Sequence, residues 1–162
     1  MDHLYYQSGK IYCQIEKDQK HYFYEDGEPK TIEHYHSGKL DGEVLLYWPN
    51  GQLKRRCYFQ MGTRNGMDEM WSDEGQLLDV GQYKQGKPFG IHSRFSPKGI
   101  LIEKTEYLDS SRFNQWVWSE EGELRLESIW LETSYKEKAW DRFENVWIEK
   151  EGFWNGKKLV YV

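Results

Sequence analysis

The residues whose types and spacing come closest to a reactive site are His34 and His36. They are two positions apart, so on a β-strand both imidazoles would project from one face, a spacing that can bind a metal ion. The corresponding positions 24 and 48 residues further on supply no additional ligand; they hold Tyr58, Gln60, Gln82 and Lys84. We therefore expect solvated strand histidines and no metal site.

The sequence gives no better support for a catalytic nucleophile or for a phosphate-binding site. Cys57 shares a predicted strand face with Leu53 and Phe59, so we expect it to pack as a small hydrophobic residue. His92 has no Ser or Cys nucleophile close to it in the sequence, and the basic run 54–56 alternates between two strand faces. The glycines are spaced for turns and not for a phosphate-binding loop. The sequence predicts no catalytic residue, no cofactor and no enzyme.

The distribution of tryptophan is more informative. Six of the eight tryptophans lie between positions 116 and 154. One interpretation is that they build a C-terminal cap that buries apolar area; the other is an exposed aromatic patch that anchors a protein partner. Both interpretations stay open, and the candidate partner-binding residues are Trp116, Trp118, Trp130 and Tyr58.

The elements that would position these residues follow a 24-residue repeat. Six columns of residues recur in phase, and arrays of this kind are typical of repeat architectures. The glycine columns are Gly27, Gly51, Gly75 and Gly99; Gly38, Gly62 and Gly86; and Gly42, Gly66 and Gly90. The others are Phe23, Tyr47, Trp71 and Phe95; Tyr35, Phe59, Tyr83 and Tyr107; and Leu53, Leu77 and Leu101.

Each repeat is predicted to contain two short strands and two turns. The segment 48–52 contains Asn50-Gly51, a strong turn signal because both residues tolerate positive φ. The second turn is predicted at 38–42, 62–66 and 86–90, between strands of about six to nine residues. Only one large anchor persists on each strand, so the strands cannot enclose a thick core. We expect a mainly β fold: an elongated antiparallel β-meander of consecutive hairpins in a single twisted sheet, with aromatic ladders between neighbours.

Both ends of the array depart from the repeat. We expect one continuous domain made of a partial N-terminal repeat (1–21), the repeat array (22–129) and an aromatic-rich C-terminal cap (130–162). Ser110 and Asn114 replace turn glycines as the pattern decays. The cap has two alternatives: a short amphipathic helix over 134–148, supported by apolar residues at positions 140, 143 and 147, or a hairpin over 153–161 that closes on Asn155-Gly156.

Composition excludes several functional classes. The 162-residue chain has a net charge of −5, and 17% of its residues are aromatic. An acidic chain is poorly suited to nucleic acid or anionic lipid, and the aromatic content argues against disorder. No apolar run is long enough to span a membrane, and the first residues do not resemble a signal peptide. Two isolated cysteines fit a reducing compartment, so we expect a cytoplasmic protein.

The segments 35–42 (YHSGKLDG) and 47–54 (YWPNGQLK) resemble the MORN-repeat variant found in bacterial proteins. The resemblance covers about residues 22–125 and implies consecutive β-hairpins. It differs from eukaryotic MORN repeats because their His-Gly-x-Gly stretch is absent, so no phospholipid role is carried over. Members of this variant family are commonly described as antitoxin-like or immunity-like.

These observations favour a non-catalytic scaffold that binds another protein through its sheet surface or an open edge. The resemblance implies an antitoxin-like or immunity-like version in which the partner is a toxin. The alternative is a structural protein that self-assembles into a homo-oligomer through open sheet edges. A carbohydrate-binding module built on Trp platforms has less support. No nucleic acid and no membrane span is expected among its interactions.

Overall fold

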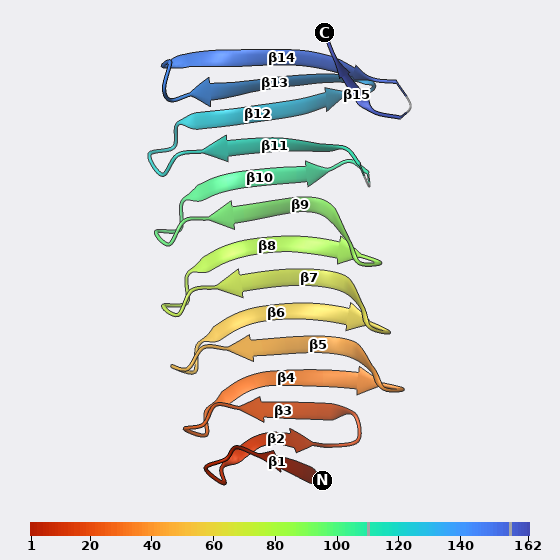
Figure 1. Cartoon of the computed structure of the whole chain (residues 1–162), viewed down its shortest axis with the longest axis vertical. Helices are drawn as coiled ribbons and strands as arrows, with labels where there is room; N and C mark the ends of the chain where they lie inside the picture. Colours follow the sequence, from red (N-terminus) through yellow and green to blue (C-terminus); the bar gives the residue numbers. More distant parts are fainter. Residues whose placement is uncertain (110, 156) are drawn as a thin grey trace. The chain divides into compact units, whose positions relative to one another are not determined.

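The computed structural model describes residues 1–109, 111–155 and 157–162. It is an all-β structure in which fifteen strands form one open sheet in chain order (Figure 1). The chain divides into two compact units, residues 1–87 and 88–162, which we describe separately. The predicted antiparallel meander of consecutive hairpins is therefore confirmed. The boundaries of the partial N-terminal repeat, the repeat array and the C-terminal cap, at 21/22 and 129/130, stay predictions.

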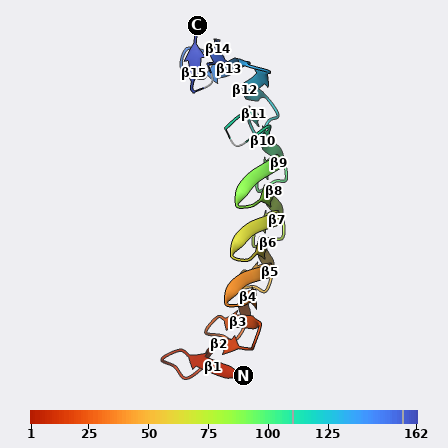
Figure 2. The ribbon, with the colours of Figure 1, turned by 90° about the vertical axis from the view of Figure 1, so that its right-hand side faces the viewer.

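The first unit is a single layer of eight strands, seen edge-on in Figure 2. They are β1 (Asp2–Tyr5), β2 (Ile11–Ile15), β3 (Gln19–Phe23), β4 (Pro29–His36), β5 (Lys39–Tyr47), β6 (Leu53–Gln60), β7 (Thr63–Trp71) and β8 (Leu77–Lys84). The second unit starts within the next strand. Its strands are β9 (Lys87–Phe95), β10 (Leu101–Tyr107), β11 (Phe113–Trp118), β12 (Leu124–Leu131), β13 (Ser134–Asp141), β14 (Val146–Trp154) and β15 (Leu159–Tyr161).

The helix considered for 134–148 is wrong, because β13 and the start of β14 occupy that segment and pair antiparallel from Ser134↔Phe153 to Asp141↔Val146. The apolar spacing that suggested a helix is also met by two strands. Trp140 and Trp147 lie directly opposite each other and stack edge to face at 5.6 Å. The alternative hairpin is present as β14 and β15, although Gly156 of its expected turn lies outside the described residues.

One kind of turn recurs six times with the same backbone hydrogen bonds. In 48–52 the Trp48 amide donates to the Gln52 carbonyl at 2.8 Å, and the Gly51 amide donates to the Trp48 carbonyl at 2.9 Å. The same two bonds close the turns at 6–10, 24–28, 72–76, 96–100 and 119–123. The fourth residue is always a glycine at positive φ, which explains the first glycine column.

The second turn is shorter than the predicted 38–42. It contains two residues, Ser37 and Gly38, both at positive φ, and strand β5 begins immediately afterwards at Lys39. The equivalent turns at 61–62 and 85–86 have the same positive-φ pair. Such two-residue turns match the twist of the strands they join. The third glycine column therefore lies inside strands and not in turns.

Gly66 shows why that third column requires glycine. Its φ is +130°, and the register between β6 and β7 shifts beside it. A Cβ added at this position would lie 2.9 Å from Cβ of Tyr58. At the equivalent Gly42 the corresponding contact is 3.4 Å from Cβ of His34. The bulged strand thus lets one side chain of the preceding strand lie against bare backbone.

Consecutive repeats are also joined at their turns. An aromatic residue, Tyr6, Tyr24 or Trp48, opens each of the first three five-residue turns and donates to the last carbonyl before the next such turn. Tyr24 Oη bonds the Tyr47 carbonyl at 2.8 Å, and Trp48 Nε1 bonds the Trp71 carbonyl at 3.0 Å. Later turns open with serine, and Ser96 Oγ instead accepts from the amides of Lys98 and Ile100 within its own turn. The first residue of the turn therefore has two roles: an aromatic residue joins neighbouring turns, whereas a serine stabilises its own turn.

The predicted stacking of aromatic columns needs correction. Residues 24 positions apart lie two strands apart, about 10 Å at ordinary strand spacing, which is beyond direct ring contact. In the first unit cations lie over rings of these columns: Arg64 lies over the Tyr83 ring at 5.2 Å, and Arg56 lies over the Trp71 ring at 5.7 Å. These column residues therefore make cation–π contacts with side chains of neighbouring strands.

Most buried residues are small or polar and lie in the middle of the strands; Tyr135, near the start of β13, and Ser96, in a turn, are exceptions. Cys57, only 4% exposed, lies directly between Val44 on β5 and Asp68 on β7. Thr105 and Ser128 hold the equivalent position in the second unit and are also buried. We call the sheet face that carries these residues the column face of each unit. Small side chains suit a single layer, since no second layer is present to cover larger ones.

Gly66→Ala should lower the free energy of unfolding by about 1–3 kcal/mol, because it adds a Cβ at positive φ against Tyr58. Urea unfolding followed by tryptophan fluorescence measures the change. Gly38→Asn is the matched control, since Gly38 has φ +76° and open space around it, and asparagine tolerates that conformation. Equal effects of the two substitutions would contradict the close-approach explanation.

Candidate protein-binding face

The residues considered for metal chemistry have structural contacts. His34 Nδ1 lies 2.7 Å from the Glu43 carbonyl oxygen, and the His34 side chain faces Gly42. His36 is exposed at the end of β4. Within the described residues no group of three or more His, Cys, Asp or Glu side chains could hold a metal ion. His34 therefore serves the packing of its hairpin.

Cys57 is buried beside a carboxylate whose charge is compensated. Asp68 accepts from Arg55 Nε and Nη2 at 2.8 and 2.7 Å, and Arg64 Nη1 lies 3.1 Å from the same carboxylate. Burial raises the pKa of the Cys57 thiol, and the nearby Asp68 charge raises it further. A reactive cysteine needs the opposite shift. Cys57 and Asp68 therefore pack in the centre of the first unit, in the environment expected of a small hydrophobic residue.

The predicted partner-binding residues do not form one patch. Tyr58 belongs to the first unit, where its hydroxyl donates to Glu43 Oε1 at 2.8 Å. In the second unit Trp116 lies opposite Glu127, and Trp130 is three residues further along β12, so the two indoles project from opposite faces. Trp118 ends β11 and is half-buried. Trp116 and Trp130, both from the tryptophan-rich part of the sequence, therefore lie on opposite faces of the sheet.

Trp130 belongs to an aromatic cluster on the column face. Its ring lies 5.1 Å from the Tyr135 ring and 6.3 Å from the Trp154 ring, and Tyr135 contacts Tyr161. All four aromatic residues lie within 130–162, the segment predicted to form the cap.

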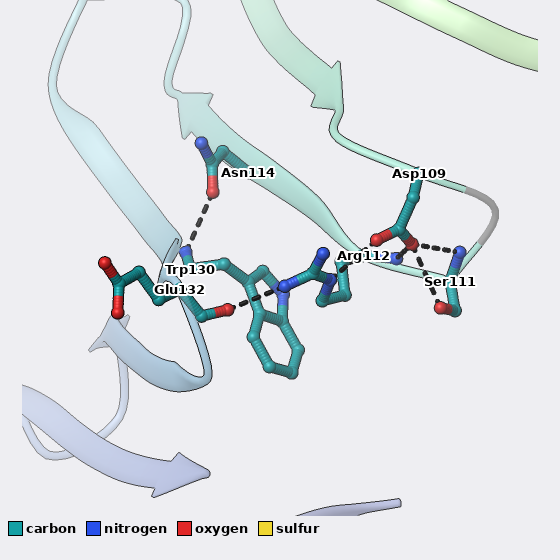
Figure 3. A network of polar contacts seen from close by, with 6 residues as sticks. All are labelled: Asp109, Ser111, Arg112, Asn114, Trp130 and Glu132. Carbon is teal, nitrogen blue, oxygen red and sulfur yellow. Dashed lines mark hydrogen bonds and ion pairs between the residues drawn. The ribbon is translucent and has the colours of Figure 1, made fainter. Parts of the chain in front are cut away.

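Asn114 on β11 and Arg112, which precedes that strand, bond to residues at the start of this cluster (Figure 3). Asn114 Oδ1 accepts from the Trp130 amide at 2.8 Å, and Arg112 Nη1 donates to the Glu132 carbonyl at 2.6 Å. Asp109 accepts from the Ser111 amide and from Arg112, and these hydrogen bonds hold the pKa of its carboxyl below the usual range. Ser110, expected to replace a turn glycine, lies outside the described residues.

The opposite face of the second unit carries the more accessible chemistry. We call it the Trp116 face; the register places these side chains on it: Trp116, Glu127, Ile129, Leu131, Lys136, Lys138, Trp140, Trp147, Glu149, Glu151 and Phe153. Trp116 Nε1 donates to Glu127 Oε1 at 3.0 Å, and Lys104 lies over the indole at 5.1 Å. Lys136 pairs with Glu151 at 2.8 Å. The middle of the face is therefore a lattice of alternating charges.

Apolar groups lie at both ends of this lattice. Leu131 is 55% exposed and Phe153 44% exposed, and both lie in register with Ser134 between them. At the other end Trp147, 40% exposed, stacks on Trp140. The charged centre encloses a hollow of only about 170 Å³, below the usual size of a small-molecule site. The charged centre therefore lacks the volume of a small-molecule site, whereas an open hollow of about 620 Å³ beside Trp140 has it.

Sequence reasoning missed Leu131, Phe153 and Trp147 as surface residues because their shared face depends on the pairing of β12, β13 and β14, and the segment 134–148 also permitted a helix. The alternation of Lys136, Lys138 and Trp140, repeated by Glu149, Glu151 and Phe153, is a two-residue period that indicates strands. That signal would have placed these residues on one face.

Burial predicts the behaviour of the two unpaired thiols. It raises the pKa of Cys13 and Cys57, and it raises the pKa of Tyr22 to about 12. The folded chain keeps these groups neutral where the unfolded chain ionises them, so stability is full at neutral pH and falls as pH rises past about 9. Urea midpoints measured from pH 7 to 10 test this fall. Cys13→Ala/Cys57→Ala should flatten it, and an unchanged slope would contradict the thiol contribution.

The comparison with protein families agrees with the observed architecture. Residues 40–61, from β5 to the turn after β6, match the model of the MORN repeat variant. No curated protein matches the chain. No helix among the described residues could span a membrane. The chain is a repeat protein of consecutive β-hairpins, and its segment 40–61 is similar to a MORN repeat variant.

Proposed function

We propose that the chain is a non-catalytic, MORN-like repeat scaffold that binds another protein through the Trp116 face. One observation carries this proposal: the uneven distribution of exposed apolar side chains. Of the sixteen large hydrophobic residues that are exposed among the described residues, only Met1, Leu4, Tyr5 and Met61 belong to the first unit. Concentrations of exposed apolar residues mark interaction surfaces.

The chemistry of the face supports a protein partner. Aromatic and aliphatic groups at its ends provide apolar anchors, and the paired lysines and glutamates between them provide polar contacts and orientation. Because these charges already compensate one another, the face has no strong attraction for a polyanion. A protein surface with complementary apolar pockets fits this pattern.

A sharper version of the proposal names the partner as a toxin. In this version the chain acts in the cytoplasm as an antitoxin-like or immunity-like protein that covers the toxin's surface. The support is the resemblance of the repeats to the bacterial MORN variant, together with two unpaired cysteines that suit a reducing compartment. A nuclease or deaminase recovered in stoichiometric amount with the chain is the expected outcome.

Leu131→Ser/Phe153→Ser should weaken partner binding by about 2 kcal/mol, roughly 30-fold in Kd, because it removes the exposed apolar anchors. Affinity capture of the tagged chain from its own host identifies the companion. Titration of the purified companion with each variant then measures Kd.

The matched control is Met61→Asn, which removes an exposed apolar side chain from a turn of the first unit at φ +48°, a conformation that asparagine accepts. Thermal unfolding of each variant separates binding effects from misfolding. Recovery of the bait alone, or equal Kd values for the face variant and the control, would overturn the proposal.

A further inference from the structure

The outer edge of β14 is open over most of its length. β15 pairs only with Gly152, Phe153 and Trp154, and the Val162 amide bonds the Glu151 carbonyl. From Val146 to Lys150 no described residue of the chain pairs with this edge. All five residues are exposed, and the first three are apolar. An exposed apolar edge is a template for a further strand.

The other end of the strand order offers a second open edge. β1 pairs with β2 alone and is the first strand of the sheet. Its sequence is Asp2, His3, Leu4 and Tyr5, and Leu4 and Tyr5 are exposed. A strand of four residues is short enough to lie along the open part of β14.

Hydrogen-bond directions restrict how the two edges can meet. On β14 the Glu151 carbonyl points outward to Val162, so by alternation the backbone groups of Trp147 and Glu149 also point outward. On β1 the Tyr6 amide bonds Lys10 on the inner side at 2.9 Å, so His3 and Tyr5 point outward. An antiparallel pair of β1 and β14 can therefore form backbone hydrogen bonds when His3 lies opposite Glu149 and Tyr5 lies opposite Trp147.

In this register the side chains are complementary as well. Asp2 falls opposite Lys150 and Leu4 opposite Ile148, while His3 falls opposite Glu149 and Tyr5 opposite Trp147. Opposite charges and apolar pairs directly across strands stabilise a sheet. A shift of two residues one way places Asp2 against Gly152, which β15 already covers. The opposite shift places Asp2 against Ile148 and loses the pairs Asp2–Lys150 and His3–Glu149.

The faces of the sheet also continue in this register. Leu4 lies opposite the buried Cys13, and the register from Ile15 through Lys20, Glu33 and Val44 to Cys57 places both on the column face of the first unit. Lys150 lies opposite Glu137, and Glu137 lies opposite Ser128 on the column face of the second unit. In this register the column face of the first unit in one copy continues into the column face of the second unit in the next copy.

We propose that the chain associates head to tail with copies of itself, β1 of one copy adding antiparallel to the open edge of β14 of the next. The two surfaces are different, so each added copy leaves one free β1 and one free β14 edge, and the association does not close on itself by necessity. This inference uses the edge of β14, whereas partner binding uses the Trp116 face; the side chains of Trp147 and Glu149 belong to both surfaces.

Charge exchange tests the pairing. Asp2→Lys and Lys150→Glu each place like charges opposite each other, and each should weaken self-association about tenfold in sedimentation velocity of the purified full chain at increasing concentration. A mixture of the two variants restores opposite charges at both kinds of contact and should associate like the unchanged chain. The double variant Asp2→Lys/Lys150→Glu should do the same.

Lys157→Glu is the matched control, since it makes the same charge change at an exposed position outside the paired segment. Asp2→Lys leaves the second unit untouched, so its effect cannot arise from the loss of the Lys150–Glu137 contact. A chain that is monomeric at every concentration would overturn the proposal. It would also be overturned if the charge exchanges left self-association unchanged, or if Leu131→Ser/Phe153→Ser abolished self-association.

Discussion

A sheet of one layer must be stabilised by contacts between neighbouring hairpins, since neither face has a second layer to pack against. That constraint explains the selection of small residues in the middle of the strands. Cys57 and Val44 are buried because adjacent strands and their side chains cover them. A larger residue at these positions would extend beyond the neighbouring side chains. The sheet therefore cannot form a conventional hydrophobic core from large side chains.

Stabilisation is instead shared among turns, bulges and charged groups. Tyr24 and Trp48 bond each turn to the next repeat, and the backbone at Gly66 admits the side chain of Tyr58. The buried carboxylate of Asp68 is satisfied by two arginines from its own hairpin. Each contact joins only nearest neighbours, as expected for a repeat protein. The first and last strands consequently lack one neighbour, and their edges remain available for other interactions.

The two proposals use the two surfaces that such an architecture leaves open. A face with apolar ends and a charged centre is suited to a protein partner, whereas an edge with unpaired backbone groups is suited to another strand. The anchors Leu131 and Phe153 on the face are separate from Val146–Lys150 on the edge, whereas Trp147 belongs to both surfaces.

The sequence by itself determined the repeat, the strand content and the antiparallel order, since glycines at fixed intervals require turns at fixed intervals. It also indicated the packing role of Cys57, because a lone thiol on an apolar strand face has no local partner for chemistry. Only the tertiary structure decided where the third glycine column lies, because a bulge at Gly66 depends on its contact with Tyr58 in the preceding strand. It also decided that 134–148 forms strands, that Trp116 and Trp130 face opposite ways, and that β14 keeps an open edge. These features depend on register between strands, and a shift of one residue in register reverses every face.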